Sequence, residues 1–163
     1  MNLKGLGVAM VTPFHHDGTI DFESIPRVVE HIVSGQADYL VVLGTTAEVA
    51  CLSAKEKRQV VQAIVSANQN RLPLVIGIGG NNTAQLVAEI QATDLSAFGA
   101  LLSVSPYYNK PTQEGIYHHF AELAKASTLP IIVYNVPSRT GSSVEASTFI
   151  RLAQDFENII AIK

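Results

Sequence analysis

The chain has 163 residues, about the length of one domain, and 47% of them are hydrophobic while 15% are charged, which excludes a disordered protein. The net charge of −3 disfavours a nucleic-acid partner, and the single cysteine, Cys51, excludes intrachain disulfides and cysteine-rich metal sites. No apolar run reaches the ~18 residues of a membrane span. The N-terminal run is too short and too weakly basic for a signal peptide. We therefore expect a cytoplasmic protein without nucleic-acid or membrane partners.

Six short apolar runs rich in β-branched residues recur along the chain, and most are continuous rather than alternating. Continuous runs are typical of strands that are buried on both faces, as in a parallel sheet. The runs predict strands at Leu6–Val11, Tyr39–Leu43, Leu74–Ile78, Ala100–Val104, Pro130–Val136 and Ile159–Ile162.

Helical patterns fill the intervals between these runs. Apolar residues from Ile25 to Val33 recur at i, i+3, i+4, i+7 and i+8, which predicts a helix with one apolar stripe. Ser53 and Glu56 form a capping box that predicts the start of the next helix. The remaining helices are expected after a cap at Asn82 or Thr83, from near Thr112, and across Val144–Ala153.

The alternation of six strands with five helices predicts a parallel sheet with right-handed crossovers. An open doubly wound sheet can stop at six strands, whereas a (β/α)8 barrel needs eight strands and roughly 250 residues. Composition and period leave this choice open. Because no linker, charge run or low-complexity segment divides the chain, we expect one domain or part of one.

The segment Gly44–Glu48 directly follows the second expected strand. Small hydroxyl residues at the carboxyl end of a strand stand where α/β folds build ligand sites. The hydroxyls of Thr45 and Thr46, together with the backbone N–H groups around them, are suited to binding a carboxylate. The alternative is an ordinary turn in which a threonine caps the next helix.

Two further strand ends carry aromatic or cationic side chains. In the segment 105–111, the neighbours Tyr107 and Tyr108 point to different sides of an extended chain, one toward a pocket and the other toward an interface. Ordinary aromatic packing is the alternative. After the fifth run, Tyr134 is followed closely by Arg139, whose guanidinium suits bidentate capture of a carboxylate. Such an arginine can also be a plain surface charge.

Lys163 follows the strictly apolar run that begins at Ile159. Because strand residues alternate between faces, we expect Lys163 to share a face with Ala161 and Ile159. On the interior of a barrel, its amine would be kept from water and neutral, as Schiff-base chemistry requires. The alternative is a lysine that snorkels out at the end of its strand. The five histidines show no metal-binding spacing, so we expect no metal site.

Taken together, these motifs resemble those of one family along the whole chain. They are VTPF at 11–14, GTTAE at 44–48, PYYNKP at 106–111, YNVPSRTG at 134–141 and NIIAIK at 158–163. Each stands at an expected strand end and is similar to a segment of the dihydrodipicolinate synthase family. That family belongs to the pyruvate-dependent class I aldolases, so GTT-x-E with a strand lysine alone would indicate only this wider superfamily.

The resemblance implies a (β/α)8 TIM barrel with a small C-terminal helical domain. Residues 1–163 would be the N-terminal portion of the single barrel domain, with about its first six strands and five helices. The implied activity is that of a lyase which condenses pyruvate with L-aspartate 4-semialdehyde to 4-hydroxy-tetrahydrodipicolinate, on the diaminopimelate pathway to lysine. The implied reaction uses no cofactor, because pyruvate is held as a covalent imine.

The resemblance also implies roles for residues that match the family's motifs. Lys163 would form the imine with pyruvate, and Tyr134 would carry protons to and from it. Thr45 and Tyr108 would complete the proton relay. Tyr108 would reach the site from the neighbouring subunit of a homotetramer, so that assembly is part of catalysis.

The implied binding residues are Thr46 with Gly44 for the carboxylate of pyruvate, and Arg139 for the carboxylate of the semialdehyde. Arg139 favours the synthase over the other enzymes of the superfamily. The alternative activities are those of an N-acetylneuraminate lyase or a keto-deoxy-sugar aldolase. A catalytically silent paralogue or an inactive fragment is a further alternative.

Three departures from the family pattern have consequences. Ala47 stands where the family most often has glycine, which restricts that turn slightly. Gln85 and Lys57 stand where members inhibited by lysine favour a glutamate and a histidine, so we expect weak inhibition by lysine. The sequence ends at Lys163, two strands short of a barrel. We therefore expect a longer polypeptide, either interrupted here by a pyruvyl-modified lysine or cloned as a fragment.

Overall fold

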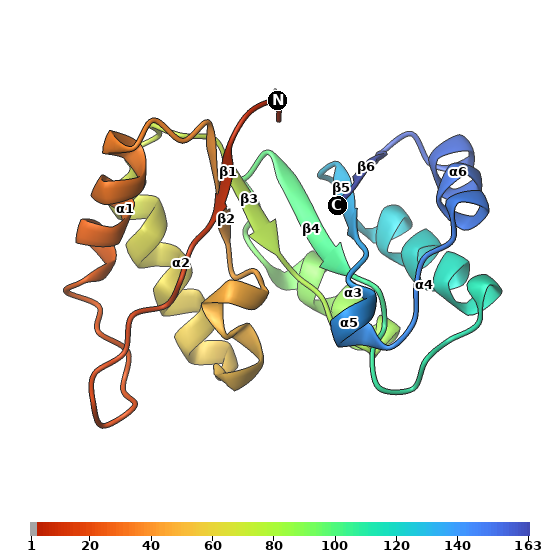
Figure 1. Ribbon diagram of the computed structural model, residues 1–163, viewed down its shortest axis with the longest axis horizontal. Helices are drawn as coiled ribbons and strands as arrows, with labels where there is room; N and C mark the ends of the chain where they lie inside the picture. Colours follow the sequence, from red (N-terminus) through yellow and green to blue (C-terminus); the bar gives the residue numbers. More distant parts are fainter. Residues whose placement is uncertain (1–2) are drawn as a thin grey trace. The chain divides into compact units, whose positions relative to one another are not determined.

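The computed structural model describes residues 3–163, and these fall into two compact units (Figure 1). Unit 1 is the chain up to Gly77 together with Ala97–Gly99, and unit 2 is Ile78–Ser96 together with Ala100–Lys163. Each unit contains three strands that run parallel to their partners, with helices between them. The predicted α/β class with six parallel strands is therefore confirmed, and it is the arrangement that part of a (β/α)8 barrel has.

Unit 1 is built from three strands and two long helices. The two helices lie side by side in Figure 1. These are β1 (Gly7–Ala9), α1 (Ile25–Ser34), β2 (Tyr39–Val42), α2 (Ala54–Asn68) and β3 (Leu74–Gly77). Strand β2 pairs with β1 on one side and with β3 on the other. Nearly every residue of β2 and β3 is buried, as continuous apolar runs predict for a strand covered on both faces.

The helices of unit 1 follow their sequence signals closely. The stripe of α1 buries Ile25, Val29 and Ile32, as its periodicity predicts. The capping box of α2 is present, because the Glu56 N–H donates to the Ser53 hydroxyl at 3.3 Å and the Ser53 N–H donates to the Glu56 carboxylate at 2.8 Å. A cap of this kind stabilises a helix by about 1 kcal/mol.

Unit 2 contains three parallel strands in the spatial order β4, β5, β6 and four helices. The elements are α3 (Thr83–Ala92), β4 (Ala100–Val104), α4 (Gln113–Ala126), β5 (Ile131–Tyr134), α5 (Pro137–Thr140), α6 (Ala146–Asp155) and β6 (Ile159–Ile162). Figure 1 shows α4 and α6 next to each other in this unit. The core packs Ile116, Phe120 and Leu123 of α4, all fully buried. Each such side chain contributes roughly 1.5–3 kcal/mol through burial.

In unit 2 the structure decides between two predicted caps and adds one helix. The side chain of Asn82, rather than Thr83, caps α3 by accepting from the Gln85 N–H at 3.1 Å. Among residues 3–163 there are six α-helices rather than five. The additional one, α5, begins at Pro137, which is preset for a first helical turn, and ends before Gly141 in a left-handed conformation. Four residues are too few to show helical periodicity.

Candidate active site

Lys163 and Tyr134 lie opposite each other across the parallel pair β5–β6. The Lys163 N–H donates to the Val133 carbonyl at 2.8 Å, and the Asn135 N–H donates to the Lys163 carbonyl at 2.9 Å. In a parallel ladder, this bond pattern makes Tyr134 the partner of Lys163, so both side chains stand on one face. The Lys163 ammonium nitrogen is 4.8 Å from the centre of the Tyr134 ring, within the range of a cation–π contact.

A β-bulge sets the register that produces this pairing. Ile159 pairs with Ile131, whereas Ala161 pairs with Ile132, so Ile160 is an extra residue in β6. Beyond the bulge, alternation restarts with Ala161 on the face that also carries Lys163. The prediction that Ile159 shares this face is therefore wrong: it stands with Ile131 on the opposite face, where it is buried.

The arrangement places a primary amine beside a phenol at the carboxyl end of the strands. The Lys163 side chain is exposed, and Tyr134 is half-buried. An amine is a nucleophile toward carbonyl carbon, and a phenol within reach can give or take a proton during the addition. Lys163 and Tyr134 are thus two predicted site residues that contact each other within unit 2.

Arg139 lies on α5, in the segment after β5, residues 135–145, which we call the β5 loop. Its guanidinium is exposed. The next residue, Thr140, is buried, and its hydroxyl lies 3.2 Å from the Val136 carbonyl and 2.7 Å from the Ser142 carbonyl. The Gly141 N–H closes the turn by donating to the Pro137 carbonyl at 2.9 Å. Arg139 is thus an exposed cation on a short turn with a fixed backbone.

Tyr108 lies in the segment between β4 and α4, residues 105–112, which we call the β4 loop. Its side chain is 88% exposed, and its backbone is left-handed with φ +70°. Beside it, the Tyr107 carbonyl accepts from the Asn81 amide at 3.3 Å and from the Asn109 N–H at 2.9 Å. Within unit 2, the Tyr108 side chain is thus left exposed to solvent.

Gly44, Thr45 and Thr46 belong to unit 1, where they follow β2. Gly44 is buried, and Thr45–Ala47 form one 3-10 turn from which both threonine side chains are exposed. The Thr12 hydroxyl donates to the Ala47 carbonyl at 2.8 Å and ties the turn to the segment after β1. The alternative role for a threonine, capping α2, is not what the structure shows, because Ser53 is that cap.

The start of this turn is fixed by a close backbone approach. Leu43, which precedes Gly44, is left-handed with φ +55°, and its carbonyl oxygen faces Gly77 at the end of β3. A Cβ atom on Gly77 would stand 2.2 Å from that oxygen, so only a glycine fits there without a backbone shift.

Sequence reasoning assigned no role to three polar residues of unit 2. Gln113 and Asn135 bind the β5 loop through their amides, as described below. His119 is buried in α4, and its Nδ1 lies 2.8 Å from the Thr83 hydroxyl. Burial lowers the pKa of His119 from 6.5 to about 4, so the ring is neutral at physiological pH. The one sequence signal for a buried His119 is its position among the apolar residues of the α4 face.

No three histidine, cysteine, aspartate or glutamate side chains among residues 3–163 are grouped so that they could hold a metal ion. Within the same range, the helices are all too short or too polar to cross a membrane.

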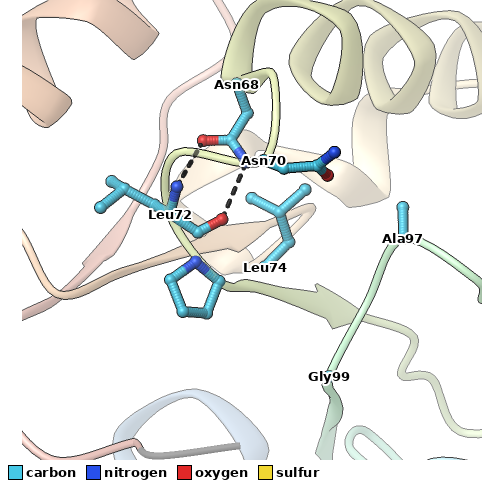
Figure 2. Close-up of a pocket in the computed structure, with 7 residues that line it drawn as sticks. Asn68, Asn70, Leu72, Leu74, Ala97 and Gly99 are labelled. Atoms are coloured by element: carbon cyan, nitrogen blue, oxygen red, sulfur yellow. Dashed lines mark hydrogen bonds between the residues drawn. The ribbon is translucent and has the colours of Figure 1, made fainter.

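A surface cavity of about 290 Å³ lies in unit 1, beside the amino end of β3 (Figure 2). Figure 2 shows Asn68, whose amide bonds both the N–H and the carbonyl of Leu72, at 3.1 and 2.8 Å. The lining residues are Asn68, Asn70, Leu72, Pro73, Leu74, Ala97 and Gly99. None of them titrates or is nucleophilic, and this is the opposite end of β3 from Gly77, so the cavity is not a candidate active site.

Comparison with known proteins places these features in one family. The sequence profile of the Dihydrodipicolinate synthetase family matches residues 2–163. The 4-hydroxy-tetrahydrodipicolinate synthase of Flavobacterium psychrophilum is 57% identical over 159 residues, which are 98% of this chain and 54% of the relative. The chain also resembles the structure of a chloride-inhibited dihydrodipicolinate synthase from Acinetobacter baumannii complexed with pyruvate. The TM-score is 0.94 and the identity 40%, over 99% of this chain and 55% of that one.

A second curated relative gives the same result. The 4-hydroxy-tetrahydrodipicolinate synthase of Azobacteroides pseudotrichonymphae is 51% identical over 161 residues, which are 99% of this chain and 54% of the relative. The chain thus spans about half the length of the curated relatives that it matches. Since the family profile covers nearly every residue, the chain belongs to the dihydrodipicolinate synthetase family.

Proposed function

We propose that this chain supplies the pyruvate-binding half of a 4-hydroxy-tetrahydrodipicolinate synthase, which condenses pyruvate with L-aspartate 4-semialdehyde. The observation that carries the proposal is the pairing of Lys163 with Tyr134, with the amine nitrogen 4.8 Å from the phenol ring. A nucleophilic amine beside a proton donor at the carboxyl end of parallel strands is the arrangement that Schiff-base chemistry needs.

The first half of the reaction uses the amine. The neutral amine of Lys163 adds to C2 of pyruvate, and the carbonyl oxygen leaves as water, which gives a protonated imine. A proton then leaves the methyl carbon, and the C–H electron pair moves toward the imine nitrogen to give an enamine. In this proposal Tyr134 carries these protons, with Thr45 and Tyr108 as its relay partners.

The second half forms the carbon–carbon bond. The enamine carbon attacks the aldehyde carbon of the semialdehyde, and the aldehyde oxygen takes up a proton to become a hydroxyl. The amino group of the semialdehyde replaces Lys163 at the imine carbon, which closes the ring and frees the lysine. Thr46 and Gly44 bind the carboxylate of pyruvate, and Arg139 binds that of the semialdehyde.

The larger assembly is part of the same proposal. Residues 1–163 form the N-terminal portion of a single (β/α)8 domain, a proposal supported by the 54% of each relative's length that the chain matches. The protein acts in the cytoplasm as a homotetramer without a cofactor. Tyr108 enters the site of the neighbouring subunit, which is consistent with its 88% exposure.

The test is the intact mass of the protein before and after incubation with pyruvate and borohydride. The expected result is a gain of one reduced pyruvyl group, which disappears in Lys163→Ala but persists in Lys125→Ala, a control on the exposed face of α4. Absence of the adduct in the native protein would refute imine formation and would favour an inactive fragment.

The acceptor is tested separately by product analysis with a panel of aldehydes. L-Aspartate 4-semialdehyde is expected to be turned over fastest, and Arg139→Ala is expected to remove this preference. Faster turnover of N-acetylmannosamine or of a sugar aldehyde would instead assign the chain to another pyruvate aldolase.

A further inference from the structure

The β5 loop is hydrogen-bonded by a side chain that lies outside it. Gln113, the first residue of α4, donates from its amide nitrogen to the Ser143 carbonyl at 2.8 Å. Its amide oxygen accepts from the Glu145 N–H at 3.1 Å and from the Thr148 hydroxyl at 2.7 Å. One side chain thereby binds the C-terminal end of the loop and the first turn of α6, about 30 residues further along the chain, with three hydrogen bonds.

A second amide side chain, that of Asn135 at the end of β5, also binds the backbone of residues 143–145. The Asn135 amide oxygen accepts from the Val144 N–H at 3.0 Å, and its amide nitrogen lies 3.4 Å from both the Val144 carbonyl and the Ser143 hydroxyl. We call Gln113 and Asn135 the amide clamp. Together they hold three consecutive residues of backbone, from Ser143 to Glu145.

The clamp is linked to Arg139 through a short series of contacts. The clamped backbone follows Ser142, whose carbonyl lies 2.7 Å from the buried hydroxyl of Thr140. Thr140 is the last residue of α5 and the neighbour of Arg139. Movement of the clamped backbone would therefore move Ser142, release Thr140 and loosen the turn that presents the guanidinium.

We propose that Gln113 and Asn135 are positioning residues, which fix the α5 turn so that Arg139 meets the carboxylate of the aldehyde substrate in one geometry. The inference rests on the proposed function for the identity of that substrate. The clamp needs amides because each side chain donates and accepts at once, which a carboxylate or an apolar isostere does not do. A rigid cation binds a carboxylate with less loss of conformational freedom than a mobile one.

The primary test is Gln113→Leu in the intact protein. The KM for the aldehyde is expected to rise roughly tenfold or more, because misplaced binding groups cost this much. Trapping of pyruvate with borohydride is expected to be unchanged, because Lys163 and Tyr134 are held by the β5–β6 ladder instead. Gln154→Leu, on the exposed face of α6, is the matched control and is expected to behave like the native protein.

Action through Arg139 is tested with a double mutant. In an Arg139→Ala background, Gln113→Leu is expected to have little further effect on kcat/KM for the aldehyde. An equal loss in both backgrounds would overturn the proposal. So would a parallel loss of pyruvate trapping, because either result would make Gln113 a general structural residue. Asn135→Asp keeps the shape and provides a second variant if Gln113→Leu folds poorly.

Hydrogen exchange separates this proposal from the proposed function. The N–H groups of Thr140 and Gly141 are expected to exchange faster in Gln113→Leu than in Gln154→Leu, whatever the substrate is. Unchanged exchange would overturn the clamp itself. Faster exchange in a protein that traps no pyruvate would retain the clamp and reject the proposed activity.

Discussion

The β4 loop and the β5 loop each carry a predicted site residue, but they hold it in opposite ways. Both contain a residue with φ +70°, which is Tyr108 in the β4 loop and Gly141 in the β5 loop. Glycine adopts this conformation freely, whereas a residue with a Cβ atom adopts it at a cost of about 1–2 kcal/mol. Strain of this kind persists where the surrounding structure holds the backbone in place, and it is frequent at functional sites.

The two loops also differ in what fixes them. The amide clamp and the Thr140 hydroxyl hold the β5 loop from within unit 2, so the backbone of the turn that carries Arg139 is fixed within one chain. In the β4 loop, the Ser105 N–H donates to the Tyr134 carbonyl at 3.2 Å and the Asn81 amide donates to the Tyr107 carbonyl at 3.3 Å, while the Tyr108 side chain is exposed. The turn that carries Arg139 is therefore held within a single chain, whereas we propose that the β4 loop is completed by a neighbouring subunit.

The largest expected effect concerns Tyr108. Tyr108→Phe keeps the ring but removes the proton carrier, and kcat is expected to fall roughly a hundredfold or more. If the phenol acts across an interface, mixing Tyr108→Phe with Lys163→Ala subunits is expected to restore activity, because some sites then combine two intact residues. Tyr107→Phe is the matched control.

Recovery on mixing would confirm that the β4 loop is completed by another chain. Two variants that stay inactive together, despite demonstrated subunit exchange, would place Tyr108 in its own subunit's site and remove the contrast between the loops.

The next effect is the pH dependence of stability that His119 gives to α4. This helix follows the β4 loop and binds the β5 loop through Gln113. In the unfolded chain His119 takes up a proton below its ordinary pKa of 6.5, whereas in the folded protein it does so only near pH 4. Unfolding therefore takes up a proton in this window, and the free energy of unfolding is expected to fall by about 3 kcal/mol as pH drops from 7 to 4.

Urea unfolding of the intact protein at several pH values measures this fall. His119→Phe is expected to flatten the pH dependence, whereas the same change at its exposed neighbour, His118→Phe, is expected to leave it steep. If the free energy of unfolding of His119→Phe still falls steeply with pH, groups other than His119 destabilise the protein in acid.

A smaller effect on stability is expected from the φ of +70° that Tyr108 and Gly141 share. Gly141→Ala is expected to lower the free energy of unfolding by about 1–2 kcal/mol, because the new Cβ is strained and would stand 2.9 Å from Lys110 Cε. Tyr108→Gly is expected to raise it by up to about 1 kcal/mol while activity is lost. Denaturant titrations measure both. A destabilised Tyr108→Gly would mean that the tyrosine is retained for packing within its own chain.

The smallest effect concerns a ligand near the β4 loop. Free lysine is expected to inhibit weakly, because exposed Gln85 has no charge to pair with an ammonium group. Gln85→Glu is expected to strengthen inhibition by about 1 kcal/mol at most, the usual value of an exposed ion pair. Steady-state rates across a lysine series measure this, with Gln91→Glu as control. Strong inhibition of the native protein would disprove the expectation.

Local signals in the sequence predicted most of the fold. Ser53 with Glu56 was predicted as a helix cap, Asn82 was one of two candidate caps, and a helix start was predicted near Thr112. These signals are readable because capping depends on residues within one turn. Continuous apolar runs predicted the strands because burial on both faces leaves no polar positions. The short α5 was missed, although Pro137 and Gly141 mark its two ends.

What could not be predicted depends on contacts between distant residues. The bulge at Ile160 exists only in the pairing of β6 with β5, so alternation along β6 alone put Ile159 on the wrong face. Gln113 is hydrogen-bonded to Thr148, 35 positions further along the chain, and no local sequence pattern predicts such a contact. The contact between Lys163 and Tyr134 fits the roles expected from the resemblance, and those roles stay predictions until they are measured.

The approach of Leu43 to Gly77 has a consequence for sequence variation. A side chain at position 77 would meet backbone rather than a movable side chain, so no neighbouring substitution can make room for it. In a saturation library selected for growth, position 77 is expected to return glycine alone, although it lies outside every proposed catalytic role. A position so intolerant of change would be mistaken for a catalytic one in a statistical survey, when its task is to set where the Gly44–Thr46 turn begins.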